Sequence, residues 1–359
     1  MFHWRGGIIQ ANVVHQLRAY AHEAEVERDL HPAQLQLIQE HGWFRMFIPK
    51  SMGGLGLTLP EVVRLETELA WADGSTAWVA TLCGGAGWFV GFVEPSVARQ
   101  FFTGDRVCIA GSGSATGIAT VVTDGYRIRG SWPYASGALH ATAFTANCVI
   151  YENGRVNLNA DGSECILPFI FQPDEVVVKH TWKAAGMIAT ASHSFSVGDV
   201  VVPAERCFEI APAAATPGDA VYQYPFLQLA EATLTANVFG MTLRFLELTR
   251  DGSLKSMESP EHVESVVKVH QEQVHTSGVR LLNIVDRSWK ELIEVNSITE
   301  PTLLQVSEAS TQLVRACRAC VDEIYPICMM EGDVRGKELN RVWRNIKTAL
   351  SHALLRTKS

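Results

Sequence analysis

The apolar residues of this chain change their spacing twice, and this change constrains the fold more than any single motif. From about residue 13 to residue 100 they recur at helical spacing, and a loop rich in glycine interrupts them at residues 48–56. From about residue 106 to residue 212 they alternate, as in short strands separated by Gly, Asn, Asp and Pro. Helical spacing then returns in four long segments, at residues 226–249, 261–293, 302–325 and 336–355.

This order predicts an α+β multidomain protein with three regions. We expect an all-α domain over residues 1–105, a β-barrel or sandwich over residues 106–212, and a four-helix bundle over residues 213–359. In the first region, Ser75 or Thr76 is placed to cap a helix that starts at residue 77. In the second region, six strands are expected, at residues 116–122, 126–132, 141–151, 165–172, 175–179 and 192–202.

Residues 124–137 carry the most local information. Asp124-Gly125 is typical of a hairpin turn, and the aromatic and branched residues that follow favour a returning strand. Trp132 and Tyr134 are two positions apart on that strand, so we expect both to face the same side. The strand ends in a small polar pair, Ser136-Gly137, which taken alone is also the pattern of a simple turn.

Composition excludes several partners. The formal net charge is −8, which favours neither nucleic acid nor an anionic membrane. No apolar run reaches the roughly 18 residues that a membrane span needs, and the start lacks the apolar core of a signal peptide. The eight cysteines are scattered through apolar segments, and the pair Cys317 and Cys320 lies within a helical pattern. We therefore expect reduced, buried cysteines, no metal site and a cytoplasmic protein.

Four stretches in order along the chain, at residues 41–56, 124–137, 181–203 and 341–352, carry a family resemblance. Together they resemble the acyl-CoA dehydrogenase superfamily, and they are most similar to its branch of flavin-dependent, two-component monooxygenases (group D). The resemblance implies a helical domain, a central β domain and a four-helix bundle. It also implies a flavin cofactor between the β domain and the bundle.

The resemblance assigns roles to particular residues. It implies that Ser136 meets the flavin ring nitrogen that changes protonation during redox chemistry, with Gly137 beside it. It places Trp132, Tyr134 and Trp182 near the flavin, although packing in a hydrophobic core explains Trp132 and Trp182 equally well. Ser136 is thus expected to be both catalytic and cofactor-binding.

His352 is the second residue that the resemblance makes catalytic. We expect it in the final helix, with Thr348 and Ala349 on the same face. In the monooxygenase branch a histidine at this place helps to form or hold the oxygenated flavin. An imidazole suits that work because its ordinary pKa near 6.5 lets it exchange protons at neutral pH.

The departures from the dehydrogenase branch also inform the expectation. Residues 110–116 lack the acid of that branch, and residues 260–273 lack the arginine that meets the pyrophosphate of a neighbouring subunit's FAD. The resemblance therefore favours FMN over FAD. It further implies a small organic, often aromatic, substrate, molecular oxygen, a separate flavin reductase and a homotetramer.

Two alternatives stay open. The chain is an acyl-CoA dehydrogenase if Glu231, on the first bundle helix, acts as the base that removes an α-proton from an acyl thioester. It is a degenerate, non-catalytic member if the incomplete signature loops have lost the flavin site. In either enzyme, Trp88, Phe89 and Phe92 are candidates for an apolar substrate pocket, together with Glu231.

Overall fold

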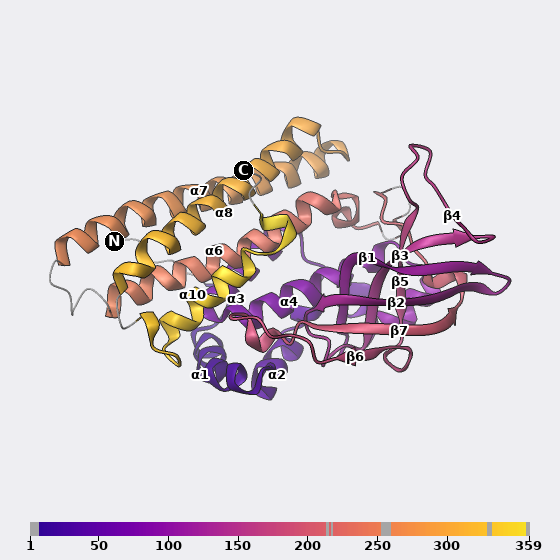
Figure 1. The fold of residues 1–359 in the computed structure, drawn as a ribbon. Helices are drawn as coiled ribbons and strands as arrows, with labels where there is room; N and C mark the ends of the chain where they lie inside the picture. Colours follow the sequence, from indigo (N-terminus) through magenta and orange to yellow (C-terminus); the bar gives the residue numbers. More distant parts are fainter. Residues whose placement is uncertain (1–6, 213–214, 217, 253–259, 329–331, 357–359) are drawn as a thin grey trace.

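The computed structural model describes residues 7–212, 215–216, 218–252, 260–328 and 332–356. Figure 1 shows a β-sheet at one end of the molecule and long helices at the other, with α3 and α4 running between them. The helices of the first region are α1 (Ala11–Glu27), α2 (Pro32–Glu40), α3 (Leu59–Ala72), α4 (Gly74–Ala86), the 3-10 turn η3 (Gly87–Gly91) and α5 (Pro95–Phe101). The order of helices, sheet and helices confirms the predicted fold, whereas the exact boundaries near residues 105 and 212 stay predictions.

Side-chain caps set where the central helices begin. Thr58 and Glu61 form a reciprocal capping box at the start of α3. Asp73 caps α4, because its carboxylate accepts both the backbone N–H and the hydroxyl of Thr76, at 2.9 and 2.7 Å. The prediction of a cap at Ser75 or Thr76 is therefore wrong by two or three residues, and Thr76 is the group that is bound rather than the cap. As a result, α4 starts directly after α3.

The strands of the second region join in one seven-stranded sheet. They are β1 (Ile109–Val122), β2 (Gly125–Ala135), β3 (Ala143–Glu152), β4 (Arg155–Val156), β5 (Ile166–Phe171), β6 (Val177–Lys179) and β7 (His193–Val202). Their order is β4-β3-β1-β2-β7-β6, and β5 also pairs with β3. The β1–β2 hairpin turns as predicted at Gly125, which has a φ of +133° and no room for a Cβ beside the Val202 carbonyl.

All six predicted strands are present, and only the short β4 was not foreseen. The ladder between β2 and β7 shifts its register twice, between Ile128 and Gly130 and again between Trp132 and Ala135. The second shift lies at the end of β2. The side chains at the end of β2 therefore no longer alternate between the two faces of the sheet, because a bulge interrupts that alternation. The end of β2 is where the candidate site begins.

The long helices follow the predicted segments closely, with one exception at the end of the chain. They are α6 (Phe226–Gly252), α7 (Pro260–Val295), α8 (Glu300–Ile324) and α10 (Glu338–Ala349). The predicted last helix runs to residue 355, but α10 ends at Ala349 and a separate 3-10 turn, η11 (Ala353–Leu355), follows it. Cys317 and Cys320 are buried within α8, as expected of core residues.

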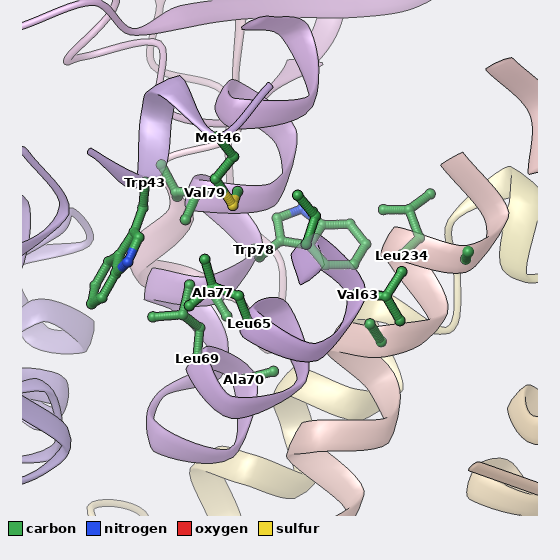
Figure 2. Close-up of a cluster of buried hydrophobic side chains, with 14 of the residues drawn as sticks. Trp43, Met46, Val63, Leu65, Leu69, Ala70, Ala77, Trp78, Val79 and Leu234 are labelled. Atoms are coloured by element: carbon green, nitrogen blue, oxygen red, sulfur yellow. The ribbon is translucent and has the colours of Figure 1, made fainter. Parts of the chain in front are cut away.

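Two hydrophobic cores lie side by side, one between the helices and one within the sheet domain. α4 joins them, since it packs against β1, α6 and α10. Figure 2 shows part of the helical core, where Trp78 of α4 and Leu234 of α6 point into the same cluster. Within the described residues, no helix is long and apolar enough to cross a membrane.

Candidate active site

Ser136 follows the end of β2 and is buried, with 4% of its surface exposed. Its Oγ lies 2.7 Å from Ser192 Oγ, which in turn lies 2.7 Å from Thr190 Oγ1. Thr190 Oγ1 donates its hydrogen to the Met187 carbonyl at 2.8 Å. Three hydroxyl groups thus form one hydrogen-bonded chain that ends on a backbone carbonyl.

The carbonyl end sets the direction of this hydroxyl chain, because each hydroxyl has a single hydrogen to donate. Thr190 uses its hydrogen on Met187, so Ser192 must donate to Thr190. Ser136 must then donate to Ser192. The lone pairs of Ser136 Oγ are left for a donor outside the chain, which makes Ser136 a hydrogen-bond acceptor.

Gly137 allows the turn formed by Ser136 and Gly137 to pack directly against α4. It has a φ of +73°, and a Cβ there would lie 2.7 Å from Cys83 Sγ and 3.1 Å from Val79 Cγ1. Cys83 Sγ lies 3.5 Å from the Ser136 carbonyl oxygen. Gly137 therefore has a structural reason to be glycine, because only glycine allows both the left-handed backbone and this close approach.

The prediction that Trp132 and Tyr134 face the same side is wrong. Trp132 is fully buried in the sheet core, where it stacks on Phe195 and donates from Nε1 to the Asn147 carbonyl at 2.9 Å. Tyr134 has a φ of +66° and is 68% exposed. The physical reason is the register shift between Trp132 and Ala135, which rotates Tyr134 out of the alternation.

Tyr134 meets Trp182 edge to face, with 6.2 Å between ring centroids. Trp182 lies in the loop between β6 and β7, and its Nε1 donates to the Met187 carbonyl at 2.8 Å. The same carbonyl receives the hydroxyl of Thr190. Tyr134, Trp182 and the hydroxyl chain are therefore parts of one connected structure.

The loop that holds Trp182 is tied to α10. The backbone N–H of Met187 donates to Asn345 Oδ1 at 2.6 Å, and that of Gly186 donates to Thr348 Oγ1 at 3.1 Å. A Cβ at Gly186 would overlap the Arg344 carbonyl, so the loop approaches the helix as closely as backbone allows. These contacts bring the end of the bundle next to the sheet side of the site.

His352 does not lie in the last helix, contrary to expectation. α10 ends at Ala349, and His352 caps the following turn, η11, with its Nδ1 accepting the Leu354 N–H at 3.3 Å. The helix cannot continue through His352, because the backbone there is extended, with φ −61° and ψ 141°. With Nδ1 as the acceptor, the neutral ring carries its proton on Nε2. Burial, and then the nearby Arg356, lower the pKa of His352 below its ordinary 6.5.

His352 and Ser136 both lie against α4. The His352 ring meets Trp78 edge to face at 5.8 Å between centroids, and the Ser136 carbonyl meets Cys83. These two α4 positions are five residues apart, or about 7.5 Å along the helix axis. Two predicted residues that are more than two hundred positions apart in the sequence therefore contact the same helix, on faces about 140° apart.

The aromatic residues predicted for a substrate pocket are mostly packed together. Trp88 is buried, stacks on Phe226 and donates from Nε1 to the Val221 carbonyl at 2.9 Å. Phe92 is buried against Trp88, at 4.4 Å between centroids. Phe89 is half-buried, so of the three it alone keeps part of its ring accessible.

Glu231 lies apart from the hydroxyl chain. Its Oε2 accepts the hydroxyl of Ser307 on α8 at 2.5 Å. It also lines a cavity of about 10 Å³ together with Thr235, Ser310 and residues 354–356. The buried hydroxyls of Thr235 and Ser310 have no protein partner, and this volume has room for about one water molecule.

Comparison with known proteins identifies the N-terminal domain and the overall fold. Residues 8–90 match the model of the acyl-CoA dehydrogenase N-terminal domain. The whole fold superposes on the crystal structure of 3-HSA hydroxylase from Rhodococcus sp. with a TM-score of 0.89 at 20% identity, covering 96% of this chain and 91% of that chain. Residues 8–90 thus resemble the N-terminal domain of an acyl-CoA dehydrogenase, and the whole chain has the fold of that hydroxylase.

The similar curated proteins are named as hydroxylases or monooxygenases. The oxygenase subunit HsaA of a flavin-dependent monooxygenase from Rhodococcus jostii is 24% identical over 357 residues, which is 94% of this chain and 91% of that protein. A pigment production hydroxylase from Rhodococcus sp. is 32% identical over 225 residues, which is 59% of this chain. The chain spans 56% of the length of that hydroxylase.

Two further structures of this fold contain a flavin. XiaF from Streptomyces sp., in complex with FADH2 and glycerol, gives a TM-score of 0.85 at 21% identity over 96% of this chain and 91% of that chain. TdsC from Paenibacillus sp., in complex with FMN and indole, gives a TM-score of 0.76 at 20% identity over 96% of this chain and 92% of that chain.

The residues of the candidate site fit the ring of a flavin. Such a ring needs hydrogen-bond partners at its edge and flat apolar surface against its faces. Ser136 supplies outward lone pairs, and Tyr134 supplies exposed aromatic surface next to Trp182. The candidate site therefore offers a hydrogen-bond acceptor and aromatic surface, two kinds of group that bind an isoalloxazine ring.

Sequence reasoning missed the residues that support the site. Ser192 and Thr190 lie within one of the four family-like stretches, yet their contact with Ser136 follows only from the fold. Trp78 and Asn345 also escaped notice, although each holds a predicted element in place. The available signal was the pattern of small hydroxyl residues, Thr190 and Ser192, immediately before a strand.

Proposed function

We propose that this chain is the oxygenase component of a flavin-dependent monooxygenase, which uses reduced flavin and molecular oxygen to hydroxylate an aromatic or other small organic substrate. The observation that carries the proposal is that the Ser136 turn and the His352 ring both contact α4, in a chain that is similar over 94% of its length to such an oxygenase subunit. When bound, the reduced flavin supplies the electrons that activate oxygen.

Ser136 is proposed to orient the flavin ring. The hydroxyl chain leaves its Oγ as an acceptor, so it binds a ring nitrogen that carries a hydrogen better than one that does not. Reduced flavin has such an N–H at the redox-active position, whereas oxidised flavin lacks it. Ser136 therefore binds reduced flavin more tightly than oxidised flavin, by the free energy of about one hydrogen bond.

His352 is proposed to act as a neutral hydrogen-bond donor through Nε2. Its Nδ1 is occupied by the Leu354 N–H, and its lowered pKa, caused first by burial and then by Arg356, keeps the ring uncharged at neutral pH. Trp78 packs edge to face against the ring and limits its rotation. A donor held in this way stabilises negative charge that develops on oxygen.

The dehydrogenase alternative finds less support. Glu231 would have to reach the α-carbon of an acyl thioester, but its carboxylate is bound by Ser307 and lines the small cavity under residues 354–356. Within the described residues, no contact links Glu231 to Ser136 or Trp182. The donor and acceptor arrangement at Ser136 and His352 suits the monooxygenase better.

The finer assignments are proposals on the same basis. We propose FMN rather than FAD as the cofactor, a separate flavin reductase as the source of reduced flavin, and a cytoplasmic location. We also propose a homotetramer, and apolar side chains exposed on the outer helices support it, namely Val269, Val279, Ile293, Val295 and Leu304.

One experiment tests the class of reaction. The purified protein is loaded with photoreduced FMN and mixed with oxygen in a stopped-flow spectrometer. We expect a transient absorbing species before oxidised flavin appears, and a product that carries one atom of labelled oxygen when substrate is present. Bleaching of the oxidised holoenzyme by an acyl-CoA, without such a transient, would show that the chain is a dehydrogenase.

A further inference from the structure

α4 is buried on almost every side, yet one stripe of it stays partly open. Leu82 and Gly85 on α4, and Phe89 on the following η3 turn, are half-buried among fully buried neighbours. Their spacing of three and four residues places them on one helical face. Trp78 lies one turn before Leu82 on the same face but is itself buried, so it closes the stripe at that end.

Glycine at position 85 lowers the stability of α4. A glycine inside a helix destabilises it by about 1 kcal/mol relative to alanine. Two other glycines of α4 are required by packing, since a Cβ at Gly84 would lie 2.7 Å from the Trp43 carbonyl and one at Gly74 would overlap Met241. A Cβ at Gly85 meets nothing within 4 Å, and its backbone is helical. Folding alone therefore gives no reason for glycine at position 85.

Aromatic rings bound the open stripe at both ends. At one end Trp78 meets His352 at 5.8 Å between centroids. At the other end Phe89 meets Phe226 at 6.0 Å and Phe208 at 5.5 Å. Phe226 is 41% exposed, and Leu354, from the turn that His352 caps, is 38% exposed. Gly85 thus lies on a partly open, apolar helix face, with aromatic clusters at both ends of that face.

The Ser136 side of the site lies on the adjacent face of the same helix. Val79 and Cys83 contact the Ser136-Gly137 turn, and each is one residue, or about 100°, from a position of the stripe. The stripe therefore lies on the face of α4 next to the one that contacts the Ser136-Gly137 turn, and Trp78 at its end contacts His352.

We propose that Gly85 determines the size of the substrate, because the open space over its Cα accommodates a ring of a multi-ring aromatic substrate. The inference rests on the proposed function, since it places the substrate beside the flavin site. Flat apolar rings suit a stripe that is edged by aromatic side chains and carries no charge. Any side chain at position 85 fills the space that the substrate ring requires.

The test compares Gly85→Ala and Gly85→Val with the wild-type holoenzyme and with Gly198→Val, a control at an open glycine in β7. Binding of phenol, naphthol and phenanthrol is measured by quenching of tryptophan fluorescence. We expect Gly85→Val to weaken naphthol and phenanthrol by about tenfold or more, and phenol by much less. We also expect Gly85→Ala to raise the thermal midpoint while it weakens phenanthrol, and Gly198→Val to change none of the affinities.

Three outcomes would overturn the inference: a wild-type protein that binds none of the three ligands, equal affinities in wild type and Gly85→Val, or an equal loss of all three ligands in that variant. Failure of the proposed function looks different. In that case the size-dependent binding is present, but no ligand gains an oxygen atom when reduced FMN and oxygen are supplied.

Discussion

The two sides of the candidate site are built in different ways. Ser136 ends a strand that is paired on both edges, its hydroxyl is the first of a three-membered chain, and Gly137 presses the turn onto α4. His352 lies on a short turn after α10, and its side chain makes one hydrogen bond, at 3.3 Å to the Leu354 N–H, and one ring contact, at 5.8 Å to Trp78. The comparison teaches that the proposed cofactor contact is rigid, whereas the proposed donor depends on a few contacts of the chain end.

The largest effect is expected from His352→Ala. If the ring donates to oxygen, its loss lowers the rate of substrate hydroxylation by about a hundredfold or more, and reoxidation of the flavin becomes uncoupled. The measurement is hydroxylated product formed per reduced flavin consumed. The matched control is His352→Asn, which preserves the cap on Leu354 but lacks the ring. An alanine variant with unchanged coupling would remove His352 from the mechanism.

A smaller effect is expected from Ser136→Ala. The loss of one hydrogen bond, worth about 1 kcal/mol, weakens flavin binding or shifts its redox behaviour by a few-fold to tens of fold. Equilibrium dialysis with reduced FMN under nitrogen measures the affinity. Ser131→Ala, on an exposed position of the same strand, serves as the control. Unchanged binding and unchanged kinetics would contradict the assigned role of Ser136.

A still smaller effect is expected from Ser192→Ala, which tests the hydroxyl chain itself. Without its acceptor, the Ser136 hydroxyl is free to turn and donate, so the preference for reduced over oxidised flavin falls by about fivefold or less. The quantity to measure is the ratio of the two dissociation constants. If that ratio rises or stays constant, the direction assigned to the hydroxyl chain is wrong.

The smallest expected effect is the contribution of His352 to the pH dependence of the free energy of unfolding. Because the pKa of His352 is lowered in the folded protein, the folded state binds its proton less readily than the unfolded state does. This contribution to stability is complete above pH 6.5, declines as the pH falls below that value, and levels off below the lowered pKa. The contribution of His352 is measured by urea unfolding of wild type and His352→Asn at about pH 7.5 and about pH 5. It is the pH-dependent part of the difference between their free energies of unfolding. A gap between the two proteins that does not change with pH would show that the ring is not buried as described.

Sequence reasoning succeeded where short-range patterns carry the structure. The alternation around residues 126–132 predicted β2, and the Gly125 turn predicted its hairpin. It failed for Tyr134, because the register shift that exposes this ring depends on β7, a strand sixty residues away. It also failed for the last helix, since periodicity does not reveal the extended backbone at His352 that prevents the helix from continuing.

The sequence by itself determined the order of the three regions, because periodicity and turn chemistry are properties of neighbouring residues. Its resemblance to a family proposed Ser136 and His352 as site residues. Only the tertiary structure decided which groups act together. It joined Ser136 to Ser192 and Thr190, set His352 against Trp78, and left open space over Gly85 rather than Gly84. The physical reason is that hydrogen-bond direction, ring contacts and free volume depend on atoms far apart in the chain, and these meet only when the sheet and the bundle pack on the two sides of α4.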